Sequence, residues 1–112
     1  VFSMHPGHVL AHYPASDVRT ETVQCLTLPQ FLARVVGDDE IAVLALDIEG
    51  VDAQILLETD WSGVNCRRLS FEALHLGPAE TAIVQRLSDA GFGHAGAGLD
   101  HHGWDLMFAR AA

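Results

Sequence analysis

Hydrophobic residues run without a break from Ile41 to Leu46, and Asp47, Glu49 and Gly50 follow at once. A strand that is apolar on both faces is typical of the middle of a parallel sheet covered by helices on both sides. Ligands of such sheets bind beyond the carboxyl ends of the strands. The pattern therefore predicts a central strand over 41–46, with Asp47 and Glu49 placed where an α/β protein usually has its site.

The residues before this strand predict a strand and then a helix. The segment Thr20–Cys25 is rich in strand-forming residues. Thr27 and Gln30 have the spacing of a capping box, which marks the start of a helix, and Gly37 is placed to end it. Four apolar side chains are expected to form the buried face of this helix: Phe31, Leu32, Val35 and Val36.

The second half of the chain continues the alternation of helix and strand. A short helix is expected after Gly50, then a strand over Cys66–Leu74, whose end carries a further carboxylate, Glu72. Pro78 and Gly91 bracket another helix, and Trp104–Ala109 is expected to be an edge strand that returns antiparallel. The fold class predicted is α/β, with three layers and a terminal antiparallel hairpin.

Composition and charge narrow the classes of function. The chain has 112 residues, enough for one domain, and 49% of them are hydrophobic, so it is expected to fold around a core. Fifteen acidic residues face six arginines and no lysine, which gives a net charge of -9. This balance argues against a nucleic-acid partner and against binding to an anionic membrane surface.

Cysteine usage and hydropathy bear on the compartment. Cys25 and Cys66 have no metal-type spacing, and two reduced, buried thiols are expected. No signal peptide and no apolar run long enough to cross a membrane are visible, so a cytoplasmic protein is predicted.

Two groups of histidines suggest a metal site as an alternative. His5, His8 and His12 have helical spacing, but Pro6 and nearby breakers argue against a helix there, so solvent-exposed histidines and no metal are expected. A second group near the C-terminus leaves the same alternative open: His94, His101 and His102.

The segment Gly91–Gly96 matches the G-x-G-x-x-G dinucleotide fingerprint in letters only. That fingerprint works when a strand precedes it and a helix follows, so that the pyrophosphate meets a helix N-terminus. A predicted helix precedes this copy. We therefore interpret it as the end of a helix followed by a hairpin.

Four segments, in this order, resemble the FkbM-type family of S-adenosylmethionine-dependent methyltransferases. Asp47-Ile48-Glu49-Gly50 is similar to the family's Asp-x-Glu-Gly signature at the end of an apolar strand. The other three are the strand and Thr-Leu turn in Val23–Leu32, the acidic strand end Ser70-Phe71-Glu72, and Gly91-Phe92 with the final strand Asp105–Phe108. The likeness spans roughly 20–110.

This resemblance implies a Rossmann-like methyltransferase sheet, of which residues 1–112 would be the C-terminal half. The first strand, its glycine-rich turn and the ribose-binding acid would belong to an N-terminal half, which is then a required partner. The implied activity is O-methylation of a hydroxyl on a sugar, glycan or other small-molecule acceptor. Asp47 is the candidate for contact with acceptor or cofactor, and Glu49 and Glu72 are further catalytic candidates.

A non-enzymatic alternative remains open. Without its first strands, the sheet would expose a long apolar edge beside 41–47, where copies of the chain could associate or another protein could bind. In that case the chain would be a non-catalytic α/β remnant that acts as a partner-binding module.

Overall fold

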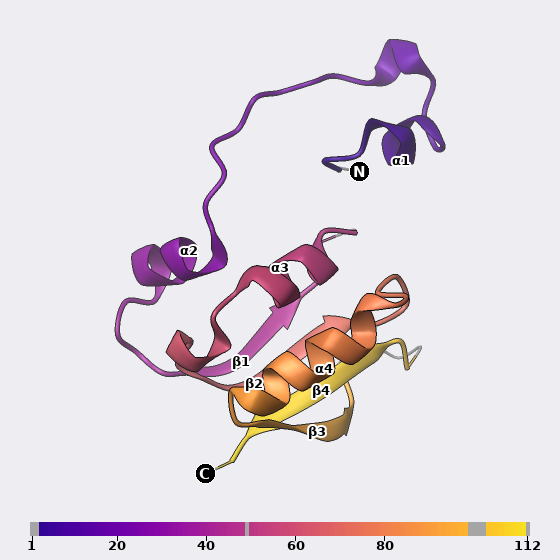
Figure 1. Ribbon diagram of the computed structural model, residues 1–112. Helices are drawn as coiled ribbons and strands as arrows, with labels where there is room; N and C mark the ends of the chain where they lie inside the picture. The colour runs from indigo at the N-terminus through magenta and orange to yellow at the C-terminus, as the bar shows by residue number, and fades with distance from the viewer. Residues whose placement is uncertain (1–2, 49, 99–102, 112) are drawn as a thin grey trace.

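The computed structural model describes residues 3–48, 50–98 and 103–111. Helices and strands alternate along most of this part of the chain (Figure 1). In chain order the elements are α1 (Pro6–Leu10), η1 (Ala15–Asp17), α2 (Leu28–Val35), β1 (Ile41–Leu46), α3 (Asp52–Glu58), η2 (Trp61–Gly63), β2 (Cys66–Glu72), α4 (Ala79–Asp89), β3 (Phe92–Ala97) and β4 (Asp105–Arg110).

The four strands form one mixed sheet in the order β1-β2-β4-β3. β1 and β2 are parallel, whereas β4 pairs antiparallel with both β2 and β3. The predicted antiparallel return of the last strand is confirmed, although β4 lies inside the sheet and β3 is at the edge. Gly91, with φ of 88°, ends α4 and leads into β3, so the interpretation of the glycine motif as a helix end and hairpin is confirmed.

The prediction that 41–46 is a central strand is wrong, because β1 lies at the other edge of the sheet. The strand expected over Thr20–Cys25 does not form; this segment is extended and unpaired in the structure and runs away from the sheet (Figure 1). No described residue therefore pairs with the outer side of β1. The expectation of an exposed apolar edge is confirmed.

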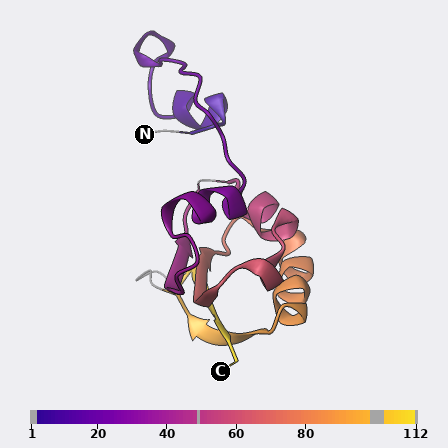
Figure 2. The same ribbon diagram turned by 90° about the vertical axis from the view of Figure 1, so that its left-hand side faces the viewer.

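Two layers form instead of the three that were predicted. α3 and α4 lie side by side on one face of the sheet, and Figures 1 and 2 show no helix across the other face in the described part of the chain. A β-α-β crossover is nearly always right-handed, which places α3 on this face, and α4 packs beside it. A third layer would need a helix before β1 that crosses the sheet, and α2 lies near the β1 edge instead.

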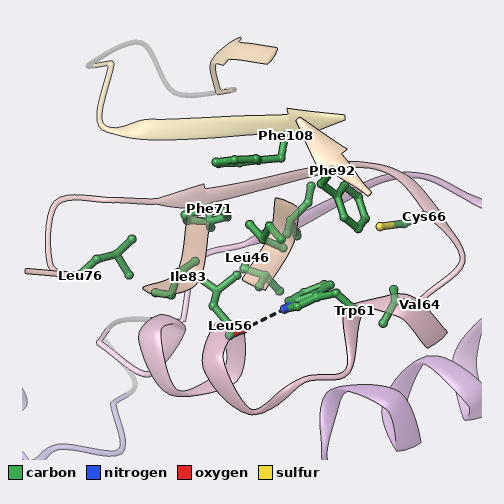
Figure 3. Close-up of a cluster of buried hydrophobic side chains, with 12 residues drawn as sticks. Leu46, Leu56, Trp61, Val64, Cys66, Phe71, Leu76, Ile83, Phe92 and Phe108 are labelled. Carbon is green, nitrogen blue, oxygen red and sulfur yellow. Dashed lines mark hydrogen bonds between the residues drawn. The ribbon is translucent and has the colours of Figure 1, made fainter. Parts of the chain in front are cut away.

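The core fills the space between these two helices and the sheet (Figure 3). Leu56 of α3 and Ile83 of α4 are fully buried against Phe71, whose ring stacks on that of Phe108 at 5.6 Å between centroids. Trp61 closes the end of α3, because its indole Nε1 donates a hydrogen bond of 2.8 Å to the Leu56 carbonyl. In the part of the chain that the structure describes, the sheet is therefore packed against helices on one face only.

The helix α2 begins where the sequence predicts, but its apolar face is not buried. Thr27 and Gln30 form both hydrogen bonds of the capping box, at 3.0 and 3.3 Å. Phe31 and Val35, expected inside, are 48% and 63% exposed. Leu32 packs against the core but is only partly buried. The periodicity correctly predicted an amphipathic helix, but periodicity does not say what covers the apolar face.

Candidate functional site

The two parallel strands end side by side, and each ends in a carboxylate. Leu46 is the register partner of Phe71, so Asp47 and Glu72 are the next residues along β1 and β2 at the same edge of the sheet. Asp47 is exposed and Glu72 is half-buried. The structure thus brings these two candidate residues together at the carboxyl ends of β1 and β2, which we call the carboxyl edge of the sheet. Glu49, the third candidate, lies outside the described residues.

A buried aspartate, Asp52, supports the turn after β1. Asp52 lies in the first turn of α3, and its Oδ2 accepts a hydrogen bond of 3.2 Å from the backbone N–H of Ile48. Gly50 lies in this turn with φ of 94°, a backbone conformation that favours glycine. Asp52 therefore fixes the path of the backbone immediately after Asp47.

Two further residues, Trp104 and Asp105, lie at this edge, although neither was expected at the site from the sequence. β4 runs antiparallel to β2, so its start lies at the edge where β2 ends, with Asp105 opposite Glu72. The Trp104 carbonyl accepts a hydrogen bond of 2.8 Å from Ala73, and the residue is 47% exposed. The predicted antiparallel return was the signal that could have found both residues, since it brings the start of the last strand to this edge.

Gly98 allows the chain to pass closely over this edge. A Cβ atom built at Gly98 would lie 2.3 Å from the Cβ of Asp105 and 2.7 Å from the Oγ of Ser70. Its backbone N–H also donates a hydrogen bond of 2.8 Å to the Asp105 carbonyl. Only glycine fits without displacing its neighbours, so Gly98 helps to set the position of Asp105.

The carboxylates at this edge can act as bases and as hydrogen-bond acceptors. Asp47 and Glu72 come from different strands, and Asp47 is the more exposed of the two. A carboxylate within hydrogen-bond reach of a hydroxyl orients it and takes its proton as the oxygen reacts. In the described part of the chain, this edge carries carboxylates and the exposed indole of Trp104.

Asp60 and Cys66, whose pKa values are shifted by their surroundings, lie away from the carboxyl edge. The Ser62 side-chain hydroxyl and backbone N–H donate hydrogen bonds to Asp60 and hold the pKa of that carboxyl below its usual range. Burial raises the pKa of the Cys66 thiol, an effect that the positive charge of Arg110 opposes. Asp60 borders a hollow of about 480 Å³ at the amino end of β1, opposite the carboxyl edge.

The histidines do not gather into a metal site in the part of the chain that the structure describes. No three His, Cys, Asp or Glu side chains are arranged there to hold an ion, although His5, His8 and His12 all fall within it. The His8 and His12 rings instead meet edge to face at 5.5 Å. Of the second group, His101 and His102 lie outside the described residues.

The cysteines and the helices give two further outcomes. Cys66 is free and buried as expected, but Cys25 is free and exposed, because the strand that was to bury it does not form. Among the described residues, no helix is long and apolar enough to cross a membrane.

Parallel strands joined through α3, with acidic residues just beyond their carboxyl ends, are typical of an α/β protein. A family model described as the methyltransferase FkbM domain matches residues 2–93. The chain belongs to this family of methyltransferases, as its Asp-x-Glu-Gly segment and the order of the four similar segments indicated. No solved structure is significantly similar to the chain.

Proposed function

We propose that this chain forms the acceptor side of an S-adenosylmethionine-dependent O-methyltransferase that acts on a hydroxyl of a sugar, glycan or other small molecule. The observation that carries the proposal is the register of β1 and β2, which puts Asp47 and Glu72 next to each other at the carboxyl edge. Membership of the FkbM methyltransferase family supports the reaction class.

The reaction asks for alignment and for a proton acceptor. The acceptor oxygen attacks the methyl carbon in line with the breaking carbon–sulfur bond, and the hydroxyl proton passes to a nearby base. Alignment supplies most of the acceleration in such displacements, and a positioned base adds to it. Asp47 is the candidate base, because its side chain is exposed at the carboxyl edge. The turn that follows it is held in place by the hydrogen bond between Asp52 and Ile48.

Trp104 supports a sugar-like acceptor. An exposed indole beside carboxylates offers an apolar face for a ring and leaves the hydroxyls to the acids. Glu72 and Asp105, opposite each other on β2 and β4, would accept hydrogen bonds from hydroxyls of the same ring. This arrangement favours a polyhydroxylated acceptor over a purely apolar one.

The residues present fit the cofactor only in part. FkbM-family enzymes generally use S-adenosylmethionine, and Asp47 could accept a hydrogen bond from its amine. The described residues, however, contain no strand that leads through a glycine-rich turn into a helix, the arrangement that holds such a cofactor. We therefore propose that an N-terminal half completes the domain and supplies these groups, and that Asp47 faces the acceptor or the cofactor from this half.

The two unpaired cysteines agree with an enzyme of the reducing cytoplasm, which is the location that we propose.

The test is transfer of labelled methyl groups from S-adenosylmethionine by the full-length protein to a set of acceptors. Monosaccharides and oligosaccharides with free hydroxyls are compared with their deoxy analogues and with simple aliphatic alcohols. We expect transfer to the hydroxylated sugars, loss of transfer when the reacting hydroxyl is absent, and little transfer to the alcohols. Equal transfer to all three groups would contradict the proposed acceptor class, and no transfer to any of them would contradict the activity.

A further inference from the structure

The imidazole of His5 lies beside the turn that follows β1. A Cβ atom built at Gly50, in this turn, would lie 3.8 Å from Cδ2 and 3.9 Å from Nε2 of the His5 ring, which is ordinary van der Waals contact. Figures 1 and 2 agree with this contact, because both place α1, which begins directly after His5, beyond the turn between β1 and α3. The segment before α2 therefore returns to the carboxyl edge of the sheet.

Short-range hydrogen bonds order the backbone around His5. Its N–H donates a hydrogen bond of 3.1 Å to Oγ of Ser3, and its carbonyl accepts one of 3.0 Å from the N–H of His8. Pro6 follows directly and restricts the backbone at the start of α1. The His5 side chain itself is exposed, and in the described part of the chain neither of its ring nitrogens has a hydrogen-bond partner. The imidazole is therefore accessible to a molecule bound at this edge.

His5 and Asp47 border the same turn. Asp47 directly follows β1, and Gly50, against which the imidazole lies, precedes α3. The hydrogen bond from Ile48 to Asp52 holds the backbone of this turn in place. A molecule that contacts Asp47 therefore lies next to the segment that carries His5.

An imidazole complements the carboxylates of the carboxyl edge. Ionised carboxylates such as those of Asp47 and Glu72 only accept hydrogen bonds, whereas each hydroxyl of a sugar both donates and accepts. A neutral imidazole donates through one ring nitrogen and accepts through the other. His5 can therefore donate to the oxygen of a hydroxyl, which the acids cannot do.

We propose that His5 is an acceptor-binding residue of the methyltransferase, a role that rests on the function proposed above. Its imidazole hydrogen-bonds a hydroxyl next to the one that reacts, and this contact holds the reacting hydroxyl at Asp47. Residues 3–10 then form one wall of the acceptor site. His5 binds and orients the acceptor, while the proton passes to Asp47.

Kinetics of full-length His5→Ala test the binding role. A hydrogen bond that the acceptor makes equally before and during the reaction affects KM and leaves kcat nearly unchanged. We expect KM for a hydroxylated sugar acceptor to rise about three- to tenfold, and kcat to stay within about twofold. His5→Gln, which keeps a donor and an acceptor, should have an intermediate KM. The control is His94→Gln in β3, at the sheet edge opposite β1, and it should match the wild type.

Acceptors that each lack one hydroxyl separate a direct contact from a structural effect. The analogue without the hydroxyl that His5 binds cannot make the contact, so its kcat/KM should be the same with wild type and His5→Ala. The other analogues that still react should lose the same three- to tenfold in kcat/KM. An equal loss for every analogue would mean that His5 acts through the fold alone, and would overturn the proposal.

Spectra of full-length protein labelled with ¹³C at the histidine Cε1 atoms give a readout without turnover. The signals of His5 and His94 are assigned by their absence from His5→Gln and His94→Gln. Saturating sugar acceptor should shift the His5 signal and leave the His94 signal in place. A shift with S-adenosylhomocysteine alone, and none with the acceptor, would place His5 at the cofactor and overturn the proposal.

The two proposals fail in different ways. Methyl transfer by the wild type with unchanged kinetics of His5→Ala would overturn the role of His5 and leave the proposed function intact. No transfer by the wild type to any acceptor would overturn both. Transfer with a raised KM in His5→Ala, and with one deoxy analogue that is insensitive to the substitution, would support both.

Discussion

At the scale of single residues, the buried carboxylate of Asp52 links the helix α3 to the turn that carries Asp47. Oδ2 accepts a hydrogen bond from the Ile48 N–H, while Oδ1 is buried and has no hydrogen-bond partner among the described residues. A buried oxygen without a hydrogen-bond partner lowers the stability of the fold. The hydrogen bond that Oδ2 of Asp52 accepts from Ile48 offsets part of this loss. Its contribution is to the shape of the turn as much as to the helix.

Asp52→Ala should therefore lower the free energy of unfolding by about 1–2 kcal/mol, since it removes the acceptor of the Ile48 N–H. Asp52→Asn keeps an oxygen in place and should cost less. Urea unfolding followed by circular dichroism measures both. The control is Glu80→Ala, which removes an exposed acid from the first turn of α4 and should cost less than about 1 kcal/mol. Equal losses for Asp52→Ala and Glu80→Ala would show that Asp52 acts only through the helix dipole.

At the scale of elements, the sequence predicted well wherever a signal is local. The capping box of α2, the apolar run of β1 and the glycine that ends α4 each depend on a few neighbouring residues, and each prediction is confirmed. Strand pairing depends on partners far along the chain. The segment Thr20–Cys25 has strand-forming residues but no neighbour in the structure, and β1 is apolar on both faces yet lies at an edge.

The site was predictable to the same extent. Asp47 and Glu72 follow from the rule that ligands bind beyond the carboxyl ends of parallel strands, and the structure does place them side by side. Trp104 and Asp105 reach the same edge because β4 pairs with β2, a partner that the predicted antiparallel return does not specify. The hydrogen bond of Asp52 to the backbone of Ile48 has no signature in the sequence, so the support that Asp52 gives to this turn was not predicted.

The end of the β3–β4 hairpin depends on the close approach of Gly98. Gly98→Ala would bring its Cβ within 2.3 Å of the Asp105 Cβ, so the hairpin must shift, and we expect a loss of about 1–3 kcal/mol. Gly93→Ala is the matched control in β3, because nothing lies within 4 Å of the added Cβ. It should change stability by less than about 1 kcal/mol. The melting temperatures of the two variants are compared by thermal denaturation. Equal melting temperatures would contradict the close packing at Gly98.

At the scale of the whole molecule, the described residues form a sheet that helices cover on one face, with the outer side of β1 unpaired (Figure 2). The carboxyl end of β1 holds the residues proposed for methyl transfer, and its amino end holds the hollow that Asp60 borders. The family match to residues 2–93 establishes the methyltransferase class.

This architecture predicts that the 112-residue chain binds S-adenosylmethionine weakly or not at all. The described residues have no glycine-rich turn between a strand and a helix, and Gly93 and Gly96 lie in β3. Isothermal titration of the purified chain is the measurement, with the full-length protein alongside. Tight binding by the chain alone would show that its residues build the cofactor site, and Gly93 and Gly96 would then be the first to substitute.

The most direct test of the proposed site is methyl transfer by full-length protein with Asp47→Asn. The substitution keeps the volume of the side chain and removes its charge, so kcat/KM toward a hydroxylated sugar acceptor should fall by about ten- to a thousandfold. The exposed position of Asp47 means that the free energy of unfolding should change by less than about 1–2 kcal/mol. Asp17→Asn, an exposed acid in η1, is the control and should leave both quantities unchanged. Full activity together with a large drop in melting temperature would make Asp47 a structural residue and contradict its place in the site.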